Sequence, residues 1–143
     1  MSKGNQSINI AIIYFCHDGA GNYLFNKRSK NCRDEVGRWD CGGGKLEFGE
    51  RVEDCLRKEL SEEYCIKPIK SEFLGFRDVH RKNRGLKTHW VALDFRVLVD
   101  RNKVKNGEPH KFDEICWFKI NKLPKKLHSQ VPLSLKKYRR ILK

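Results

Sequence analysis

The sequence predicts a single domain of mixed α/β or α+β structure over residues 1–143, and three observations support this class. The length of 143 residues suits one domain that buries its own core. Apolar residues form several short β-type runs and two stretches with helical spacing. The order is two strands, a helix, three strands and a helix, without the regular strand–helix alternation of βαβ proteins.

Each element is indicated by its own pattern. Apolar, β-branched residues over 8–15 predict a first strand, and residues 23–25 begin a second across a glycine-containing turn. Residues 29–38 predict a loop, and the three glycines at 42–44 are expected to interrupt regular structure. A helix is expected over 50–64, followed by strands over 73–79, 88–99 and 115–120, with a basic loop at 80–87. Residues 133–142 have helical spacing, with Pro132 in the first turn.

Composition limits the classes of partner and compartment. The 31 Lys and Arg exceed the 18 Asp and Glu, and the net charge of +13 predicts attraction to polyanions such as nucleotides, nucleic acid or an anionic membrane surface. The polar start and the lack of a long apolar run predict a cytoplasmic protein with no membrane partner. The six cysteines lack C-x-x-C spacing, and most of them are expected to act as small buried hydrophobes. Four histidines show no ligand spacing and are expected to be structural or exposed: His80, His89, His110 and His128.

Three carboxylates of the predicted helix fall on or beside its buried face. At about 100° per residue, Glu59 and Glu63 continue the apolar stripe of Val52, Leu56 and Leu60, and Glu62 flanks it. The other side of the wheel holds residues expected to face solvent: Glu53, Asp54, Arg57, Ser61 and Tyr64. Clustered carboxylates repel one another and resist burial, so either a hard divalent cation such as Mg²⁺ compensates them or they form an ordinary acidic patch.

The glycines before the helix favour the first interpretation. A glycine-rich loop lets the backbone approach phosphate oxygens or a metal ion closely. A loop that can hold phosphate and a carboxylate cluster that can hold Mg²⁺ together provide the minimum apparatus for cleaving a phosphoanhydride.

The same segment resembles the box of the Nudix hydrolases, also called MutT-like. The box reads G-x5-E-x7-R-E-U-x-E-E-x-G-U, where U is a bulky aliphatic residue. It begins at Gly44, places Glu50 six residues later, and continues through Glu59, Glu62 and Glu63 to Ile66, a span of 23 residues. The resemblance implies an α/β/α sandwich with a central mixed sheet. It also implies hydrolysis of a nucleoside diphosphate linked to another group, by attack of water at phosphorus.

The resemblance assigns roles by position. Glu59, Glu62 and Glu63 would bind Mg²⁺, or Mn²⁺ in its place, and the carbonyl of Gly43 would add a ligand. Glu50 would support the cluster, and a glutamate inside or outside the box would activate water. Two positions depart from the pattern: lysine at 58 loses the forked hydrogen bonds of arginine, and Cys65 replaces a glycine, so a positive φ there would cost energy.

Further candidates lie outside the carboxylate cluster. The substrate phosphates would meet Gly43, Gly44 and Lys45, and the position of Arg28 at the end of the second strand resembles one that often does so. Asp113 and Glu114 precede Trp117-Phe118, where relatives place a base-reading acid or a metal ligand. Arg28 and these acids could equally be surface residues. The tryptophans at 39, 90 and 117 would stack a base or fill the core.

Three functions follow as hypotheses. The first is a Mg²⁺-dependent pyrophosphohydrolase of a small nucleotide such as a (d)NTP or an oxidised (d)NTP, with nucleotide sugars, ADP-ribose and dinucleoside polyphosphates as open alternatives. The second is a pyrophosphohydrolase of RNA 5′ ends, which the nine Lys and Arg after Glu114 would favour if they contact RNA rather than form a solvated face. The third is a Nudix-fold module that binds nucleotide or RNA without cleaving it. We expect a monomer or a homodimer.

Overall fold

The computed structural model describes residues 6–143, so the first five residues of the polar start lie outside the described part. The strands are β1 (Ile8–His17), β2 (Asn22–Arg28), β3 (Trp39–Asp40), β4 (Gly43–Lys45), β5 (Lys70–Asn83), β6 (Leu86–Leu98) and β7 (Phe112–Lys119). The helices are α1 (Val52–Tyr64) and α2 (Val131–Lys137), with short 3-10 turns η1 (Arg101–Lys103) and η2 (Ile120–Lys122). Within residues 6–143, no helix is both long and apolar enough to cross a membrane.

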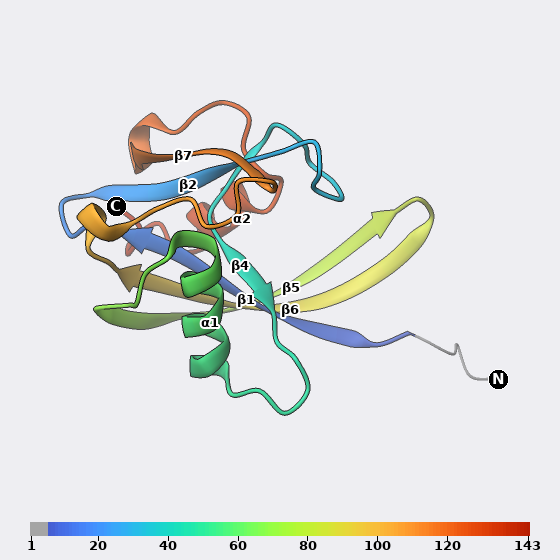
Figure 1. The fold of residues 1–143 in the computed structure, drawn as a ribbon. Coiled ribbons are helices and arrows are strands. Elements are labelled where there is room, and N and C mark those ends of the chain that lie inside the picture. Colours follow the sequence, from blue (N-terminus) through green and yellow to red (C-terminus); the bar gives the residue numbers. More distant parts are fainter. Residues whose placement is uncertain (1–5) are drawn as a thin grey trace.

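Strand β1 lies at the centre of a seven-stranded mixed sheet with the order β3-β2-β1-β6-β5 (Figure 1). It runs parallel to β6 from the pair Ile8–His89 to the pair His17–Leu98, and the other pairings are antiparallel. The predicted hairpin of the first two strands is reduced to one pair, His17 with Tyr23. Strand β4 pairs with residues 11–13 of β1, before the point where β2 pairs with it, and β2 pairs mainly with β7.

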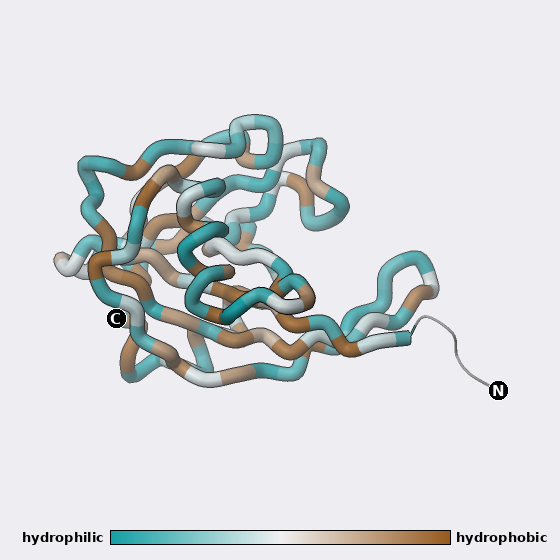
Figure 2. Tube along the Cα trace, turned by 60° about the horizontal axis from the view of Figure 1, so that its bottom comes forward, coloured by the Kyte–Doolittle hydropathy of each residue, from teal (hydrophilic) through white to brown (hydrophobic). Residues whose placement is uncertain are grey.

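The two faces of the sheet carry one helix each, as the sandwich expectation requires. Alternate residues of β1 point to opposite faces. On one face Ile12 and Tyr14 pack in a cluster with Leu60 of α1. On the other face Phe15 packs in a cluster with Val131 of α2. In Figure 2 the apolar segments run mainly through the body of the molecule, while most of the loops are hydrophilic.

The glycine segment forms regular structure where the sequence predicted an interruption. Gly43 and Gly44 belong to β4 and pair with Ile13 and Ile12 of β1. A Cβ on Gly43 would lie 2.7 Å from the carbonyl oxygen of Ile12. The glycines therefore permit close strand pairing instead of preventing it.

The expected basic loop at 80–87 is also mostly strand. Strands β5 and β6 pair from Lys70–Leu98 to Asn83–Leu86 with one register shift between Phe73 and Gly75, leaving Arg84 and Gly85 as the turn. Cross-strand hydrogen bonds override the charged composition of this segment, which extends beyond the rest of the sheet in Figure 1. The last helix is shorter than expected, because α2 ends at Lys137 and hydrogen-bonded turns continue to Leu142.

The C-terminal end of α1 departs from the helical wheel at one residue. Tyr64 was expected to face solvent, but it is buried against Phe112 of β7. Its hydroxyl donates to the carbonyl oxygen of Cys41 at 2.5 Å. The loop and strand that cover this side of the helix end come from distant parts of the chain, which a helical wheel does not represent.

Replacing Cys65 by glycine is expected to stabilise the protein by about 0.5–1 kcal/mol, because Cys65 ends α1 in the left-handed conformation with φ of 59°. The relief of strain exceeds the loss from the more flexible unfolded chain. The cysteine is exposed, so little packing is lost. Urea unfolding measures the gain. Cys65→Ala, which keeps a Cβ, should show none, and an equal gain in both variants would contradict the strain argument.

Candidate active site

Glu63 is a buried carboxylate beside the glycine segment. Its side chain is on α1, and the residue is 9% exposed. The hydroxyl of Tyr14 and the backbone N–H of Gly43, the latter at 3.1 Å, donate to its Oε1 atom. Burial raises the pKa of the Glu63 carboxyl to about 8, although both hydrogen bonds oppose this rise. Ionised Glu63 therefore requires a compensating positive charge.

Glu59 and Glu62 lie next to Glu63 on the same helix. Burial raises the pKa of the half-buried Glu59 carboxyl, and the charge of Glu62 raises it further. The Glu62 side chain is exposed. A Cβ on Gly44 would lie 2.1 Å from the Cδ atom of Glu59, so glycine at position 44 leaves room for this carboxylate in its observed position. The glycine segment thus shapes the carboxylate cluster, here defined as Glu59, Glu62 and Glu63.

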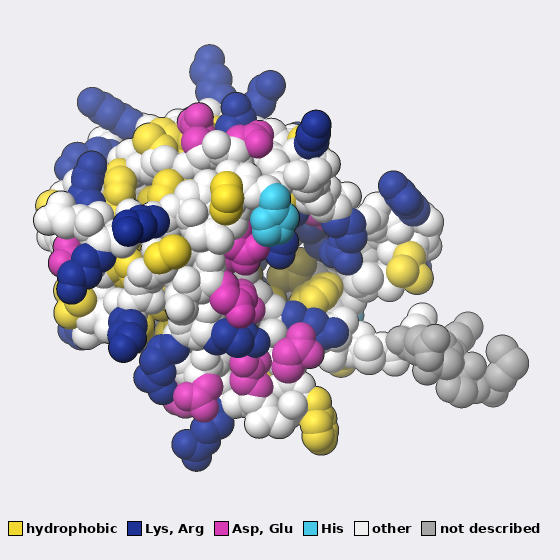
Figure 3. Space-filling model, in the orientation of Figure 1, with side chains coloured by type: hydrophobic (Ala, Val, Ile, Leu, Met, Phe, Trp, Pro, Cys, Tyr) yellow, Lys and Arg dark blue, Asp and Glu magenta, His cyan; other side chains and the backbone are white. Residues whose placement is uncertain are grey.

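No ion pair within residues 6–143 involves the carboxylate cluster, although the chain has 31 Lys and Arg. In contrast, Glu50 forms an ion pair with Lys58, with 2.8 Å between Oε2 of Glu50 and Nζ of Lys58. The hydrogen bond from Lys58 lowers the pKa of the Glu50 carboxyl. The charge of Lys58 also acts to lower the pKa of Glu59, and the supporting role of Glu50 stays a prediction. Figure 3 shows Asp and Glu side chains gathered over α1 on a face that Lys and Arg surround.

The chemistry of the cluster fits a hard divalent cation. Carboxylate oxygens are the ligands that Mg²⁺ prefers, and a buried carboxylate without a cationic partner gains most from one. The three side chains are adjacent, but their oxygens do not all lie within 4.8 Å of one another in the described structure. The Gly43 backbone contributes its N–H to Glu63, and its carbonyl remains a predicted ligand.

A cleft of about 880 Å³ lies on the sheet face of β1 that carries Ala11 and Ile13. Three predicted substrate-binding residues line it: Arg28, Gly44 and Lys45. Trp90 also lines it, whereas Trp39 is buried in the α2 cluster and Trp117 packs under Arg101. Gly44 of β4 lines the cleft and also borders Glu59, whereas Glu59, Glu62 and Glu63 are not part of the cleft lining and lie on the α1 side of the sheet.

Some charged side chains of the cleft form ion pairs, and others do not. Asp34 and Asp40 hold Arg28 at 3.0 and 3.7 Å. Three cations of the lining have no ion-pair partner in the part of the chain that is described: Arg33, Lys45 and Arg84. These are free to bind phosphate oxygens. Arg33 and Arg84 were not singled out from the sequence, because a loop arginine and a turn arginine carry no local pattern.

Asp113 and Glu114 lie on β7, exposed and outside the lining of the cleft, with Glu114 opposite Lys27 in the sheet register. A site role for either stays a prediction. Another acid that sequence reasoning missed, Glu108, lies close enough to raise the pKa of Glu59. The Gly107 N–H donates to the carbonyl of Glu63 at 2.9 Å, and a Cβ at 107 would lie 2.2 Å from the carbonyl oxygen of Glu62. The sequence signal for this contact was Gly107, next to Glu108, because a glycine often permits such a close approach of two backbone segments.

Replacing Gly44 by alanine is expected to lower kcat at least about tenfold, because the new methyl group displaces Glu59 from its position. The comparison is Arg57→Ala on the exposed side of α1, which should leave kcat unchanged. Hydrolysis rates at saturating substrate test this effect, with thermal unfolding to show that both variants fold. Wild-type kcat in a folded Gly44→Ala protein would mean that the position of Glu59 does not matter for the reaction.

Comparison with known proteins adds independent findings. The family model described as NUDIX domain matches residues 8–138. The nucleoside triphosphatase NudI of Salmonella paratyphi B is 32% identical over 111 residues, covering 72% of this chain and 77% of that protein. The oxidized purine nucleoside triphosphate hydrolase of Danio rerio is 33% identical over 99 residues, 62% of this chain and 54% of that protein, so the match spans about half of its length.

The fold is similar to solved structures over nearly the whole chain. A MutT NUDIX hydrolase from Burkholderia pseudomallei has a TM-score of 0.81 and 24% identity, covering 93% of this chain and 99% of its own. A MutT protein from Methanosarcina mazei Go1 has a TM-score of 0.71 and 21% identity, covering 95% and 96%. At these identities the two structures support the α/β/α architecture itself.

Proposed function

The chain belongs to the NUDIX family of hydrolases, and we propose on that basis that it hydrolyses a phosphoanhydride of a nucleoside triphosphate. The observation that carries the proposal is Glu63, a buried carboxylate that forms no ion pair with any residue of 6–143. Its neighbour Glu59 borders Gly44, which on the other side of β4 lines a cleft that also carries arginines. This arrangement brings a site for a divalent cation next to a site for phosphates.

A small nucleotide is the proposed substrate class, a (d)NTP or an oxidised (d)NTP. Relatives of similar sequence are named as triphosphatases of nucleosides or of oxidised purine nucleosides. The cleft volume of about 880 Å³ lies within the range of small-molecule sites. Trp90 in its lining offers an aromatic face to a base.

The proposed roles of the residues follow from their positions. Glu59, Glu62 and Glu63 hold Mg²⁺ or Mn²⁺, which when bound neutralises phosphate charge and lowers the pKa of water. Arg33, Lys45 and Arg84 bind phosphate oxygens from the cleft side. Lys58 fixes Glu50 next to the cluster. A glutamate of the box, or one outside it such as Glu108, accepts the proton of the attacking water.

A product screen tests the proposal. Purified protein with Mg²⁺ is offered the (d)NTPs, an oxidised purine triphosphate, nucleotide sugars, ADP-ribose and a 5′-triphosphate RNA, and chromatography separates nucleoside monophosphate from diphosphate. We expect turnover of at least one triphosphate, dependent on the divalent cation. Binding of nucleotide without any turnover would overturn the hydrolase proposal and support a binding module.

A second candidate is hydrolysis at the 5′ end of RNA, favoured by the many exposed cations of the segment after Glu114. They are Lys119, Lys122, Lys125, Lys126, Lys136, Lys137, Arg139, Arg140 and Lys143, and all but Lys119 follow β7. If several of these contact phosphates, RNA binding must weaken steeply as salt increases. Filter binding of a 5′-triphosphate RNA at about 50–200 mM salt measures this slope, and a flat response excludes the candidate.

A further inference from the structure

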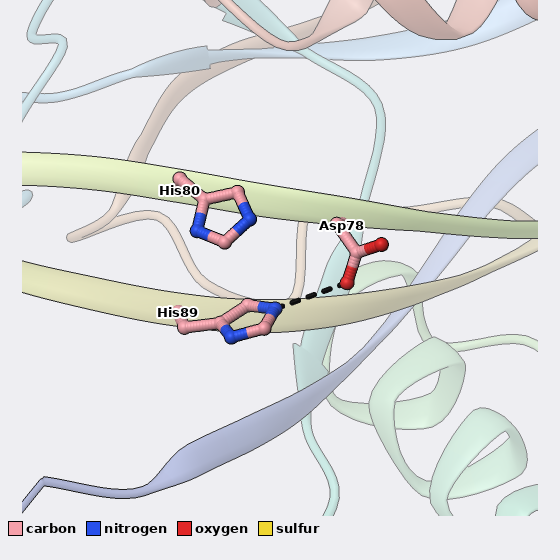
Figure 4. A group of neighbouring side chains, drawn as sticks. All are labelled: Asp78, His80 and His89. Carbon is pink, nitrogen blue, oxygen red and sulfur yellow. Dashed lines mark hydrogen bonds and ion pairs between the residues drawn. The ribbon is translucent and has the colours of Figure 1, made fainter.

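Two histidines that sequence reasoning treated as isolated lie together on the β5–β6 hairpin. Figure 4 shows Asp78 and His80 on β5 beside His89 on β6. The rings of His80 and His89 stack with centroids 4.2 Å apart at an interplanar angle of 29°. The Nε2 atom of His89 lies 3.0 Å from the Oδ1 atom of Asp78. One ligand atom from each of the three side chains lies within 4.8 Å of the others.

The strand register explains why these side chains meet. His80 lies directly opposite His89 in the antiparallel pair, and Asp78 is two residues before His80 on the same face. The sequence separates the histidines by nine positions and was expected to form a loop there. The continuous pairing of β5 with β6, and not any local ligand spacing, creates the cluster.

We propose that Asp78, His80 and His89 form a second metal site, which binds a borderline transition-metal ion of the Zn²⁺ class. Two imidazoles and a carboxylate suit such an ion better than Mg²⁺, which prefers oxygen ligands alone. Ligand atoms about 2.1 Å from zinc lie at most about 4.2 Å apart, so small rotations of exposed side chains complete the site. The exposure also leaves coordination positions for water.

The position of this site connects it to the cleft without making it part of the reaction centre. Val79, Arg81, Thr88 and Trp90 alternate with the three ligands along the same two strands, and they line the cleft on the opposite face. An ion that links β5 to β6 therefore reinforces the wall of the cleft from behind. This inference stands on the hairpin alone and does not depend on the proposed function.

Calorimetric titration of the full chain with Zn²⁺ tests the site, after chelator treatment and in saturating Mg²⁺ to occupy the carboxylate cluster. We expect one zinc site, weakened at least about tenfold in His80→Ala and in His89→Ala, each of which loses a ligand. Asp78→Asn should also bind more weakly. The control is His110→Ala, an exposed histidine outside the cluster, which should bind zinc as the wild type does.

Two further readouts separate this site from its alternatives. Zinc should raise the Tm of the wild type and of Glu63→Gln, because a ligand that binds the folded state stabilises it. It should not raise the Tm of His80→Ala or His89→Ala, because each of these variants lacks a zinc ligand. Zinc binding lost in Glu63→Gln would place the ion at the carboxylate cluster. Absence of zinc binding in the wild type, or equal binding by His80→Ala, His89→Ala and His110→Ala, would overturn the proposal.

Discussion

Glutamine at position 63 is expected to reduce nucleotide hydrolysis at least about a hundredfold while the protein remains folded. The amide oxygen of glutamine still accepts hydrogen bonds from Tyr14 and Gly43, so the local packing is retained. The amide carries no charge to hold a divalent cation. The loss should therefore appear in kcat and in the concentration of Mg²⁺ needed for half-maximal rate.

The matched control for this variant is Glu53→Gln, on the first turn of the same helix and exposed. It removes one negative charge from α1 but none from the carboxylate cluster, and the hydrolysis rate should stay at the wild-type value. Equal rates for wild type and Glu63→Gln would show that the cation binds elsewhere. A rate lost equally in both variants would instead indicate a general effect of helix charge.

The second large effect concerns stability and pH in the absence of divalent cations. Because burial raises the pKa of Glu63 to about 8, the folded chain holds a proton that the unfolded chain has already released. The contribution of this group is fully present below the unfolded pKa and is lost as pH rises toward 8. The free energy of unfolding should fall by up to about 1.4 kcal/mol for each pH unit in this window.

Urea unfolding from pH 5 to 8 with a chelator present, on wild type and Glu63→Gln, measures this contribution by difference. Glu63→Gln should lack the Glu63 part of the slope, so its advantage over wild type should grow with pH. Saturating Mg²⁺ should shrink that advantage, because a bound cation favours the ionised carboxylate. Parallel curves for the two proteins in chelator would mean that Glu63 titrates normally in the folded state.

Much of the fold was predictable because its signals are local. The run of apolar, β-branched residues in β1 and the spacing of Leu56 and Leu60 in α1 each arise within a few residues. The errors occurred where distant segments decide the outcome. Gly43 becomes strand because β1 offers a partner, and Tyr64 is buried because β7 covers it. The charged 80–87 segment is strand because each half pairs with the other.

The same distinction applies to the site. The helical wheel predicted that Glu59 and Glu63 share a helix face, and the structure buries them to different degrees beside Gly43 and Gly44. Tyr14, which donates to Glu63, is 49 residues away in sequence and could not be paired with it from local pattern. The same reasoning missed Glu108, and the position of Asp113 and Glu114 on β7 leaves their roles as predictions.

The parallel pairing of β1 with β6 has a consequence for how the chain folds. Ile8 pairs with His89, 81 residues later (89 − 8 = 81), so the central strand lacks its main neighbour until most of the chain is available. Long-range pairings of this kind must close large loops before they gain contacts, and they slow folding. We expect folding on the millisecond-to-second scale, with β1 dependent on α1 and β4 for early protection during synthesis.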